Sequence, residues 1–515
     1  MTLAIALQTA DWAVLAAYVA LLLCAGWFLA RREARDVKGY FLAARSMPAW
    51  AVAVSILATA QSAATYVGAP EKGWNGDLRY LLANLGVVVA AIVVSTVFLP
   101  AYYRLNVQTP YELLETTCGP AARRTASVWY LLGRFMASGV RVYIGALPFC
   151  LAVFGEVTPG GLVACIAGFM AFGAVFTLAG GVRAAIWSDV IQVGVYIGSA
   201  VVILLILLGH IPLHGEALWD AIALGPVDAN GVHKGLTVVG PLSENVDLSK
   251  PFTILTGLTG WALLNIAFFA MDQDLTQRLL ACKSSREAAK SLLINTVAIT
   301  FPVVVLFCTL GLLMGVFYTR VDVMGSVPTV VGAGLGDEST RRLVDFSALH
   351  APAGALGLML AGVLAAGPAG INSSLNSMAS AVIADLYRPA RPGRTERHYV
   401  VAGRLATVLC GVVMAFFAAS CIVLRGRQDL IDFALGVMPF AYAGLLGVFA
   451  GAVILKRVPQ RWAVASMPTG LAVVIVLAVS TTLASPWQLV VGSVAAFAVC
   501  WLGTVVTGRA AQRAV

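Results

Sequence analysis

The chain alternates between long apolar runs and short segments rich in charged residues, Gly and Pro. A helix needs about 20 consecutive apolar residues to cross the hydrocarbon core of a bilayer. About thirteen runs approach or exceed this length, so the pattern predicts an all-α multi-pass membrane protein with about thirteen transmembrane helices. The runs lie near residues 11–30, 49–70, 80–101, 126–154, 159–179, 185–209, 252–276, 290–318, 351–384, 399–424, 429–455, 462–484 and 487–507.

Composition supports a membrane location. Of the 515 residues, 60% are hydrophobic and only 11% are charged, with a mean hydropathy of +0.87, whereas soluble domains carry roughly a quarter charged residues. The first run follows Asp11 and precedes Arg31, Arg32 and Arg35. This charge order is typical of a retained anchor with an outside N-terminus, not of a cleaved signal peptide. We therefore treat residues 1–515 as a single domain.

Most of the 34 Lys and Arg residues fall in alternate loops, on the side reached after the first run. Basic loops prefer the cytoplasmic face, so the bias predicts a protein of the cell (inner) membrane with a cytoplasmic C-terminus. Loops that face anionic lipid also explain the net charge of +9 without a nucleic-acid partner. No protein partner is implied by the sequence.

Catalytic and metal-binding patterns are absent from the sequence. The nine Cys lie mostly in apolar runs without a CxxC pair, and the five His are scattered singly. No nucleotide fingerprint or nucleophile motif occurs, so we expect no enzyme activity and no metal beyond a transported cation.

Polar residues within the runs carry the functional prediction. In the run 351–384, small residues recur at spacings of three and four and therefore share one helix face. These residues are Ala366, Gly370, Ser373, Ser377 and Ser380. The face either packs tightly against another helix or offers hydroxyl and carbonyl oxygens to a cation.

Two other runs combine Gly, Thr and amide side chains at mid-membrane depth. They are residues 55–74 and 255–274, which occupy matching places in two halves of the chain. Interrupted helices in matching places predict a binding site between inverted repeats. The repeats would be residues 49–209 and 252–455.

Two arginines lie seven residues apart on one face of the run 126–154. Arg134 could extend to the cytoplasmic interface, but Arg141 lies near the middle, where a charge costs at least ~3 kcal/mol unless it is paired. Its partner is either a structural carboxylate or the carboxylate of a solute. Since few acidic residues fall inside the runs, we predict a small organic anion, such as a monocarboxylate, as the solute.

Five motifs then indicate a family. They are GYFLAARSMPAW (39–50), TPYELLE (109–115), FTLAGGVRAAIWSDVIQ (176–192), DQDLTQRLLACKS (272–284) and SLNSMASAVIADLYRP (374–389). In this order they resemble the sodium/solute symporters, which include sugar, proline, iodide, sialic acid and monocarboxylate carriers. SAATYVGAPEKGW (62–74) is more similar to the carboxylate and iodide branch.

The resemblance implies a plan and a mechanism. A five-plus-five inverted-repeat core of the LeuT type would follow an extra N-terminal helix at 11–30 and precede two C-terminal helices at 462–507. It implies secondary active transport by alternating access, in which a cation, sodium in the family, drives symport of a small-molecule solute across the lipid bilayer.

The resemblance also implies cation-binding positions. The usual sodium site matches carbonyl groups of Ala58, Gln61 and Ala366, whereas its two hydroxyl positions fall on Ala369 and Gly370, which lack side-chain oxygens. This loss should weaken the site by several kcal/mol unless other groups replace the ligands. A second sodium position matches Asp189, Asn372 and Ser373. Alternatively, Asp189 could carry a proton (H+) or pair with Arg183 or another loop arginine.

Solute-binding positions of the family match Ala60, Ala64, Thr65, Asn265 and the gating aromatic Phe268, to which the charge argument adds Arg141. The alanines lack the polar groups that bind sugars, so a sugar is not expected. The alternatives are a proton-coupled or uncoupled carrier, or a transporter-like sensor that has lost the usual sodium site. The sequence specifies neither the solute nor the stoichiometry.

Overall fold

The computed structural model describes residues 7–30, 41–61, 63–227, 233, 235–328, 338–424 and 430–512. Side chains of 26–30, 64, 174–181, 338–340, 368, 369, 430, 431 and 508–512 fall outside this description. Of the predicted site residues, Ala64 and Ala369 are therefore placed by their backbone alone.

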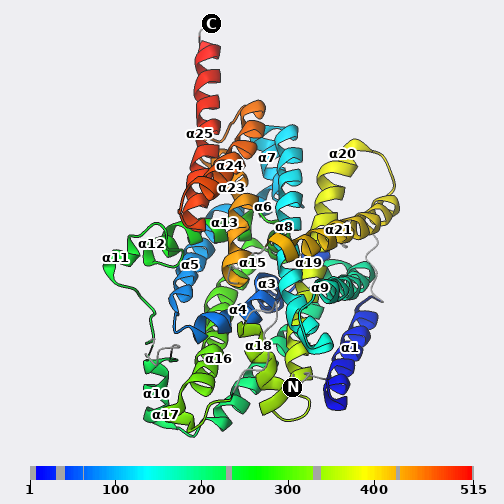
Figure 1. Cartoon of the computed structure of the whole chain (residues 1–515). Helices are drawn as coiled ribbons and strands as arrows, with labels where there is room; N and C mark the ends of the chain where they lie inside the picture. The colour runs from blue at the N-terminus through cyan, green and yellow to red at the C-terminus, as the bar shows by residue number, and fades with distance from the viewer. Residues whose placement is uncertain are drawn as a thin grey trace.

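The described part of the chain is built almost entirely from helices (Figure 1). In chain order they are α1 (Thr9–Ala30), α3 (Ala49–Ala60), α4 (Ala63–Trp74), α5 (Ala83–Val93), α6 (Leu99–Leu105), α7 (Tyr111–Cys118), α8 (Pro120–Phe154), α9 (Pro159–His210), α10 (Gly215–Leu224), α11 (Leu242–Asn245), α12 (Ile254–Thr256), α13 (Ala262–Ala270), α14 (Gln273–Leu280), α15 (Ser285–Leu293), α16 (Phe301–Thr319), α17 (Val321–Met324), α18 (Glu338–Asp345), α19 (Ala355–Ala381), α20 (Arg388–Ala390), α21 (Glu396–Leu424), α22 (Leu430–Gly436), α23 (Met438–Ile454), α24 (Gln460–Ser480) and α25 (Ser485–Gln512).

The prediction of an all-α multi-pass membrane protein is confirmed. Within the described residues, nine helices are long and apolar enough to span a bilayer, and two bent helix pairs raise the number to as many as eleven. Two shorter apolar helices, Thr9–Ala25 and Pro159–Gly173, coincide with the remaining predicted runs. Every predicted run is thus helical, while the number that crosses the membrane stays a prediction.

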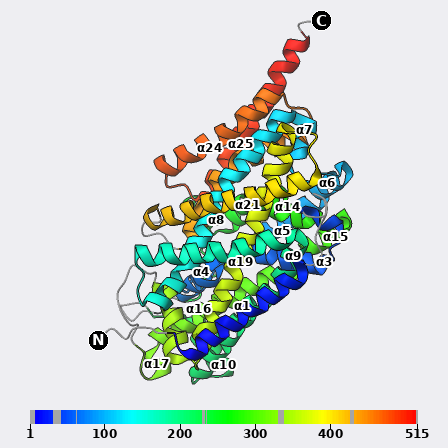
Figure 2. The same cartoon turned by 90° about the vertical axis from the view of Figure 1, so that its right-hand side faces the viewer.

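Helices α8 and α19 form the centre of the bundle. Of the apolar window of α19, 81% is buried, against 28% for α21 and for α24. α19 packs along α9 and α8, and α1 covers α9 and α19 from outside (Figure 2). Side chains that project from the central helices therefore meet protein, whereas α21 and α24 offer apolar surface to lipid.

Both bent pairs lie in the segments where the sequence predicts interrupted helices. α3 ends at Ala60, Gln61 takes an extended conformation (φ −80°, ψ 151°), and the chain resumes at an angle of 68°. In the other pair, Ile254–Ala270 and Gln273–Leu280 meet at 58°, and the Asp272 side chain caps α14 by accepting from the backbone N–H of Asp274. Each break frees backbone groups and polar side chains inside the bundle.

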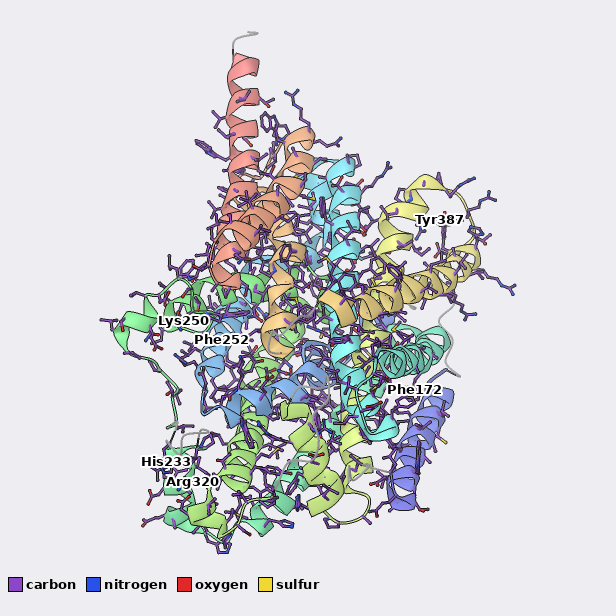
Figure 3. The ribbon with its side chains drawn as sticks, in the orientation of Figure 1. Phe172, His233, Lys250, Phe252, Arg320 and Tyr387 are labelled. Carbon is purple, nitrogen blue, oxygen red and sulfur yellow. The ribbon has the colours of Figure 1, made fainter. Side chains whose placement is uncertain are left out.

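The two ends of the molecule differ in their connections. α7, α20 and the end of α25 lie at one end, and α10 and α17 lie at the opposite end (Figures 1 and 2). At the latter end, Arg320 pairs with Asp322 and donates to the carbonyl oxygens of Ala221 and Gly225 (Figure 3). The described parts of the segments 210–250 and 319–350 thus contain short helices, held together partly by this arginine.

α4 and α16 approach so closely that Gly311 is needed at their contact. A Cβ at Gly311 would overlap the carbonyl oxygen of Pro70, a backbone atom that cannot turn away. We expect Gly311→Ala to lower the free energy of unfolding by ~1–3 kcal/mol through overpacking. Thermal unfolding in detergent measures this loss. Gly194→Ala on α9 is the matched control, since a Cβ there meets nothing within 4 Å; equal stability of the two variants would contradict the packing argument.

Candidate functional site: a central cavity beside a broken helix

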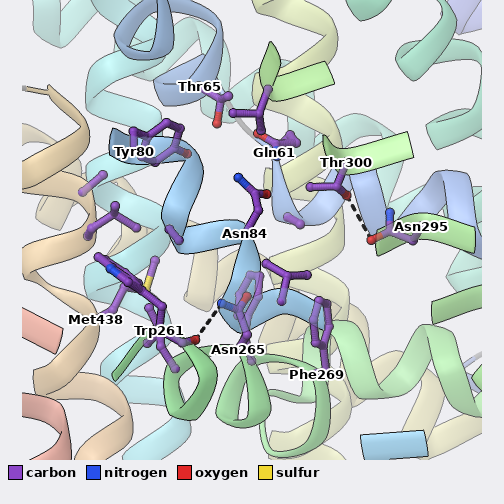
Figure 4. Close-up of a pocket in the computed structure, with 18 of the residues that line it drawn as sticks. Gln61, Thr65, Tyr80, Asn84, Trp261, Asn265, Phe269, Asn295, Thr300 and Met438 are labelled. Atoms are coloured by element: carbon purple, nitrogen blue, oxygen red, sulfur yellow. Dashed lines mark hydrogen bonds between the residues drawn. The ribbon is translucent and has the colours of Figure 1, made fainter. Parts of the chain in front are cut away.

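A cavity of about 150 Å³ lies at the break between α3 and α4 (Figure 4). Its wall combines amide, aromatic and small apolar side chains from both halves of the chain. The lining residues are Ala60, Gln61, Thr65, Tyr80, Ala83, Asn84, Val87, Arg141, Trp261, Leu264, Asn265, Phe268, Phe269, Asn295, Thr300, Val304, Ala434, Leu435, Met438 and Tyr442.

The structure brings five of the six predicted solute-binding residues to this one cavity. They are Ala60, Thr65, Arg141, Asn265 and Phe268. The side chain of the sixth, Ala64, lies outside the description. The helix break explains the arrangement, because it turns Ala60 and Thr65 toward α13, which carries Asn265 and Phe268.

Arg141 is the only charged residue among the described residues that line the cavity. Its Nη1 donates to the carbonyl oxygen of Thr59 (2.9 Å), and its guanidinium lies 5.6 Å from the centre of the Phe268 ring. Within the described part of the chain, no carboxylate forms an ion pair with it. The cavity therefore carries a positive charge that no carboxylate among the described residues contacts directly.

Several polar lining residues were not predicted. Asn295 donates to the carbonyl oxygen of Ala53 (2.9 Å) and accepts from Thr300 (3.1 Å). The predicted residue Asn265 donates to the carbonyl oxygen of Trp261 (2.8 Å) (Figure 4). Asn84 on α5 and Asn295 between α15 and α16 belong to no motif that the sequence analysis identified. The one sequence feature that could have predicted them as lining residues is the presence of an amide side chain inside an apolar run.

The prediction that Arg134 extends to the cytoplasmic interface is wrong. Arg134 is 1% exposed and forms ion pairs with Asp272 (3.1 Å) and with Asp274. Its Nε and Nη2 also donate to Ser374 of α19. The break before α14 carries two carboxylates into the bundle, and their charges offset the cost of burying Arg134.

The ion pairs continue from Asp274 into a buried network. Asp274 also pairs with Arg278 (2.9 Å), and Arg278 pairs with Asp189 (3.0 Å). The network of Arg134, Arg278, Asp189, Asp272 and Asp274 is at most 2% exposed and contains two cationic and three anionic groups. It therefore retains one uncompensated negative charge if all its members are ionised.

Asp189, proposed from the resemblance as a cation ligand, belongs to this network. Its Oδ2 accepts from Ser55 and from Arg278. The ion-pair partner of Asp189 is therefore another loop arginine, from the predicted loop between the runs 252–276 and 290–318, and not Arg183. Its Oδ1 is buried without a hydrogen-bond partner among the described residues. One carboxylate oxygen is thus held, and the other is available to a ligand.

The polar face of α19 is used for packing at several positions. Ser373 donates to Asp274, Ser377 forms a hydrogen bond with Tyr130 (2.8 Å), and Gln273 donates to Ser380 (3.3 Å). Asn372 lies on the same helix and is 5% exposed. Packing, one of the two predicted uses of this face, is therefore seen at Ser373, Ser377 and Ser380, while cation binding stays a prediction.

A second, much smaller cavity of about 10 Å³ lies between α3, α9 and α19. It is lined by Leu57, Ala58, Gln61, Gln192, Val193, Tyr196, Ala365 and Ala366. Three residues of the first predicted cation site, Ala58, Gln61 and Ala366, meet here. Gln61 lines both cavities.

A helical membrane protein with interrupted helices around a central polar cavity has the architecture of a secondary transporter. The profile of the Sodium:solute symporter family matches residues 40–470, so the chain belongs to this family. The family prediction is confirmed, and the expectation that the chain is a transporter and not an enzyme is confirmed with it.

The relatives include carriers of different anions. The sodium/iodide cotransporter of Homo sapiens is 25% identical over 464 residues, which cover 89% of this chain and 67% of the relative. The sodium-coupled monocarboxylate transporter 1 of Xenopus laevis is 23% identical over 460 residues, covering 87% and 68%. A solved Na+-coupled sialic acid symporter in a substrate-bound outward-open state superposes with a TM-score of 0.79 at 23% identity, covering 96% of both chains, which confirms the fold.

Proposed function

We propose that this protein couples sodium entry to the uptake of a small organic anion such as a monocarboxylate. One observation carries the proposal: Arg141 is the only charged group among the described lining residues of the central cavity, and it lacks a carboxylate partner. Membership of the family supports sodium as the coupled ion.

The cavity suits a carboxylate with a short carbon skeleton. A guanidinium binds a carboxylate through two parallel charge-assisted hydrogen bonds, while Phe268, Phe269 and Trp261 provide apolar contact for carbon atoms. The described lining contains no Asp or Glu to accept hydrogen bonds from the hydroxyl groups of a sugar. Iodide, monocarboxylates and sialic acid, named for three of the relatives, are anions at neutral pH, whereas another relative, of Vibrio parahaemolyticus, is named for glucose.

Binding by the purified protein tests the solute class. In detergent with sodium present, thermal stability is measured against a panel of short carboxylates, each matched with its neutral amide, and against iodide. We expect stabilisation by carboxylates and none by the amides, because only the anion compensates Arg141. Equal stabilisation by acid and amide would contradict the proposal, and stabilisation by iodide alone would replace the carboxylate with an inorganic anion.

Transport would follow alternating access. The cation and the solute bind near the midplane, and the repeats at 49–209 and 252–455 move relative to each other, so that the cavity opens to one side at a time. We place the N-terminus outside and the C-terminus in the cytoplasm, in the cell membrane. Coupling requires that each ligand raise the affinity for the other.

One sodium position is proposed at Asp189, Asn372 and Ser373. The buried, unpaired Oδ1 of Asp189 supports it, since a cation compensates a carboxylate oxygen that no donor reaches. We expect Ser373→Ala and Asp189→Asn to raise the sodium concentration for half-maximal uptake by about tenfold or more. Ser377→Ala, on the same helix but bonded to Tyr130, is the control. Unchanged sodium dependence in both variants would refute this position, and uptake driven by a proton gradient and lost in Asp189→Asn would favour H+ as the coupled ion.

A further inference from the structure

Tyr442 of α23 forms part of the wall of the central cavity. The residue is 3% exposed, and its ring packs edge-to-face against Phe268, with 6.4 Å between the ring centres. Phe268 in turn lies 5.6 Å from the guanidinium of Arg141. Tyr442 is therefore separated by a single side chain from the group that is proposed to bind the anion.

The hydroxyl group of Tyr442 connects this wall to the buried ion-pair network. It donates to Oδ2 of Asp272, the oxygen that also accepts from Arg134 (3.1 Å). Oδ1 of Asp272 accepts from the backbone N–H of Asp274 (2.8 Å). The Asp272 carboxylate thus joins a residue of the cavity wall to two members of the network.

From Asp272 the hydrogen bonds lead to the proposed sodium position. The side chain of Asp274 accepts from Ser373, one of the residues of that position. Asp274 also pairs with Arg278 (2.9 Å), and Arg278 pairs with Asp189 (3.0 Å), a second residue of that position. A continuous series of hydrogen bonds therefore runs from the cavity wall on α23, through the break before α14, to α19 and α9.

We propose that Tyr442 is a positioning residue: the bond from its hydroxyl group to Asp272 is the contact through which the solute anion and the coupled cation raise each other's affinity. The inference rests on the proposed function and deepens it, because it assigns the coupling of the two ligands to one side chain. Tyr442 belongs to none of the five motifs that indicate the family, so the contact is recognised from the structure alone.

The cation acts on the cavity by ordering the network. The network holds one excess negative charge when all its members are ionised, and a cation compensates this charge. Its carboxylates then keep fixed positions, so Asp272 holds the hydroxyl group of Tyr442 and the ring stays against Phe268. The anion therefore meets a wall that is already in place, and less free energy is spent on ordering it. By reciprocity, the anion raises the affinity for the cation by the same factor.

Tyr442→Phe tests this role, because it removes the hydroxyl group and keeps the ring. Asp272 retains its bonds from Arg134 and from the Asp274 N–H, so the variant should remain folded. Affinity for a short carboxylate is measured from thermal stability of the purified protein, once in sodium chloride and once in choline chloride of equal ionic strength. We expect the ratio of the two affinities to fall by about fivefold or more, while the affinity in choline changes less than about twofold. Attraction between cation and anion through space survives the substitution, so the loss reports the hydrogen bond.

Tyr102→Phe is the matched control. The hydroxyl group of Tyr102 is also buried and donates to the carbonyl oxygen of Ala270 (2.6 Å), at the same helix break but outside the network. Its removal should leave the affinity ratio unchanged. In a Ser373→Ala background, Tyr442→Phe should lower the ratio little further, because both substitutions interrupt one path.

The outcomes separate this role from the function on which it rests. A wild-type affinity ratio in Tyr442→Phe would overturn the role and leave the proposed function intact. Carboxylate affinity that falls equally in sodium and in choline would also overturn it, since the hydroxyl group would then bind the anion directly. An equal loss in Tyr102→Phe would assign the effect to packing at the break and overturn the role as well. A wild-type protein in which sodium and the carboxylate do not change each other's affinity would overturn both the role and the proposed function.

Discussion

Arg141→Gln is expected to reduce the affinity for the transported anion by at least ~100-fold, because two charge-assisted hydrogen bonds disappear together. The variant should remain folded. Arg141 forms no ion pair within the described residues, and its protein contacts are one hydrogen bond to the Thr59 carbonyl oxygen and the face of Phe268. Anion affinity is measured from the rise in thermal stability as the anion is added, and from the anion concentration that gives half-maximal uptake.

Arg141→Lys separates charge from geometry. A lysine keeps the positive charge but loses the planar pair of donors, so its affinity should lie between those of the wild type and Arg141→Gln. If Arg141→Gln binds every transported anion like the wild type, the guanidinium has no part in recognition. The cavity would then need another basis for its selectivity.

Arg134→Leu is expected to destabilise the protein by ~3–5 kcal/mol, because it leaves the buried carboxylate of Asp272 without its ion-pair partner. Asp274 would keep only Arg278 as an ion-pair partner, and Ser374 would keep only Ser138 as a donor. Expression and thermal stability in detergent report the loss. Arg388→Leu is the control, since its pair with Glu396 is about two-fifths exposed and contributes at most ~1 kcal/mol.

The two arginines are thereby distinguished by different measurements. Loss of Arg134 should appear as a loss of stability, and loss of Arg141 as a loss of anion affinity in a stable protein. A stable Arg134→Leu variant with weakened anion binding would contradict the structural role assigned to the network.

Much of the fold could be predicted because the bilayer imposes a strong constraint on the sequence. Each spanning helix must satisfy its own backbone hydrogen bonds and present apolar side chains to lipid, so every predicted run falls on helices of the structure. Two features differ: α9 joins the runs 159–179 and 185–209 into one helix, and short helices such as α7, α10 and α17 lie outside the runs. The breaks at Gln61 and Asp272 could be located as well, since Gly, Thr and amides stand out against Leu, Val and Ala.

Partners of the buried charges could not be predicted in the same way. Arg134 meets Asp272 and Asp274 across 138 and 140 residues of sequence. The apolar pattern gives the depth of a residue along its helix but not which helix it faces. Depth alone therefore allows Arg134 to reach the interface. The carboxylates that pair with it belong to the motif DQDLTQR, but the sequence does not show that this motif faces Arg134.

The small cavity shows the same limit. Gln61 is a predicted cation-binding position, because a carbonyl group of the family's sodium site matches it. Gln192 is not predicted, since the sequence shows it only as an amide in an apolar run. Only the packing of α9 against α3 and α19 brings the two amides to one cavity.

Uptake driven by an imposed sodium gradient tests the central claim most directly. Purified protein is reconstituted in liposomes, and accumulation of a labelled short carboxylate is followed under an inward sodium gradient. Separate samples receive a potassium gradient or a proton gradient in place of the sodium gradient. We predict accumulation above equilibrium that requires the sodium gradient, collapses when an ionophore dissipates it, and is lost in Arg141→Gln. Equilibration without accumulation, or accumulation that is independent of sodium, by a folded wild-type protein would contradict the account.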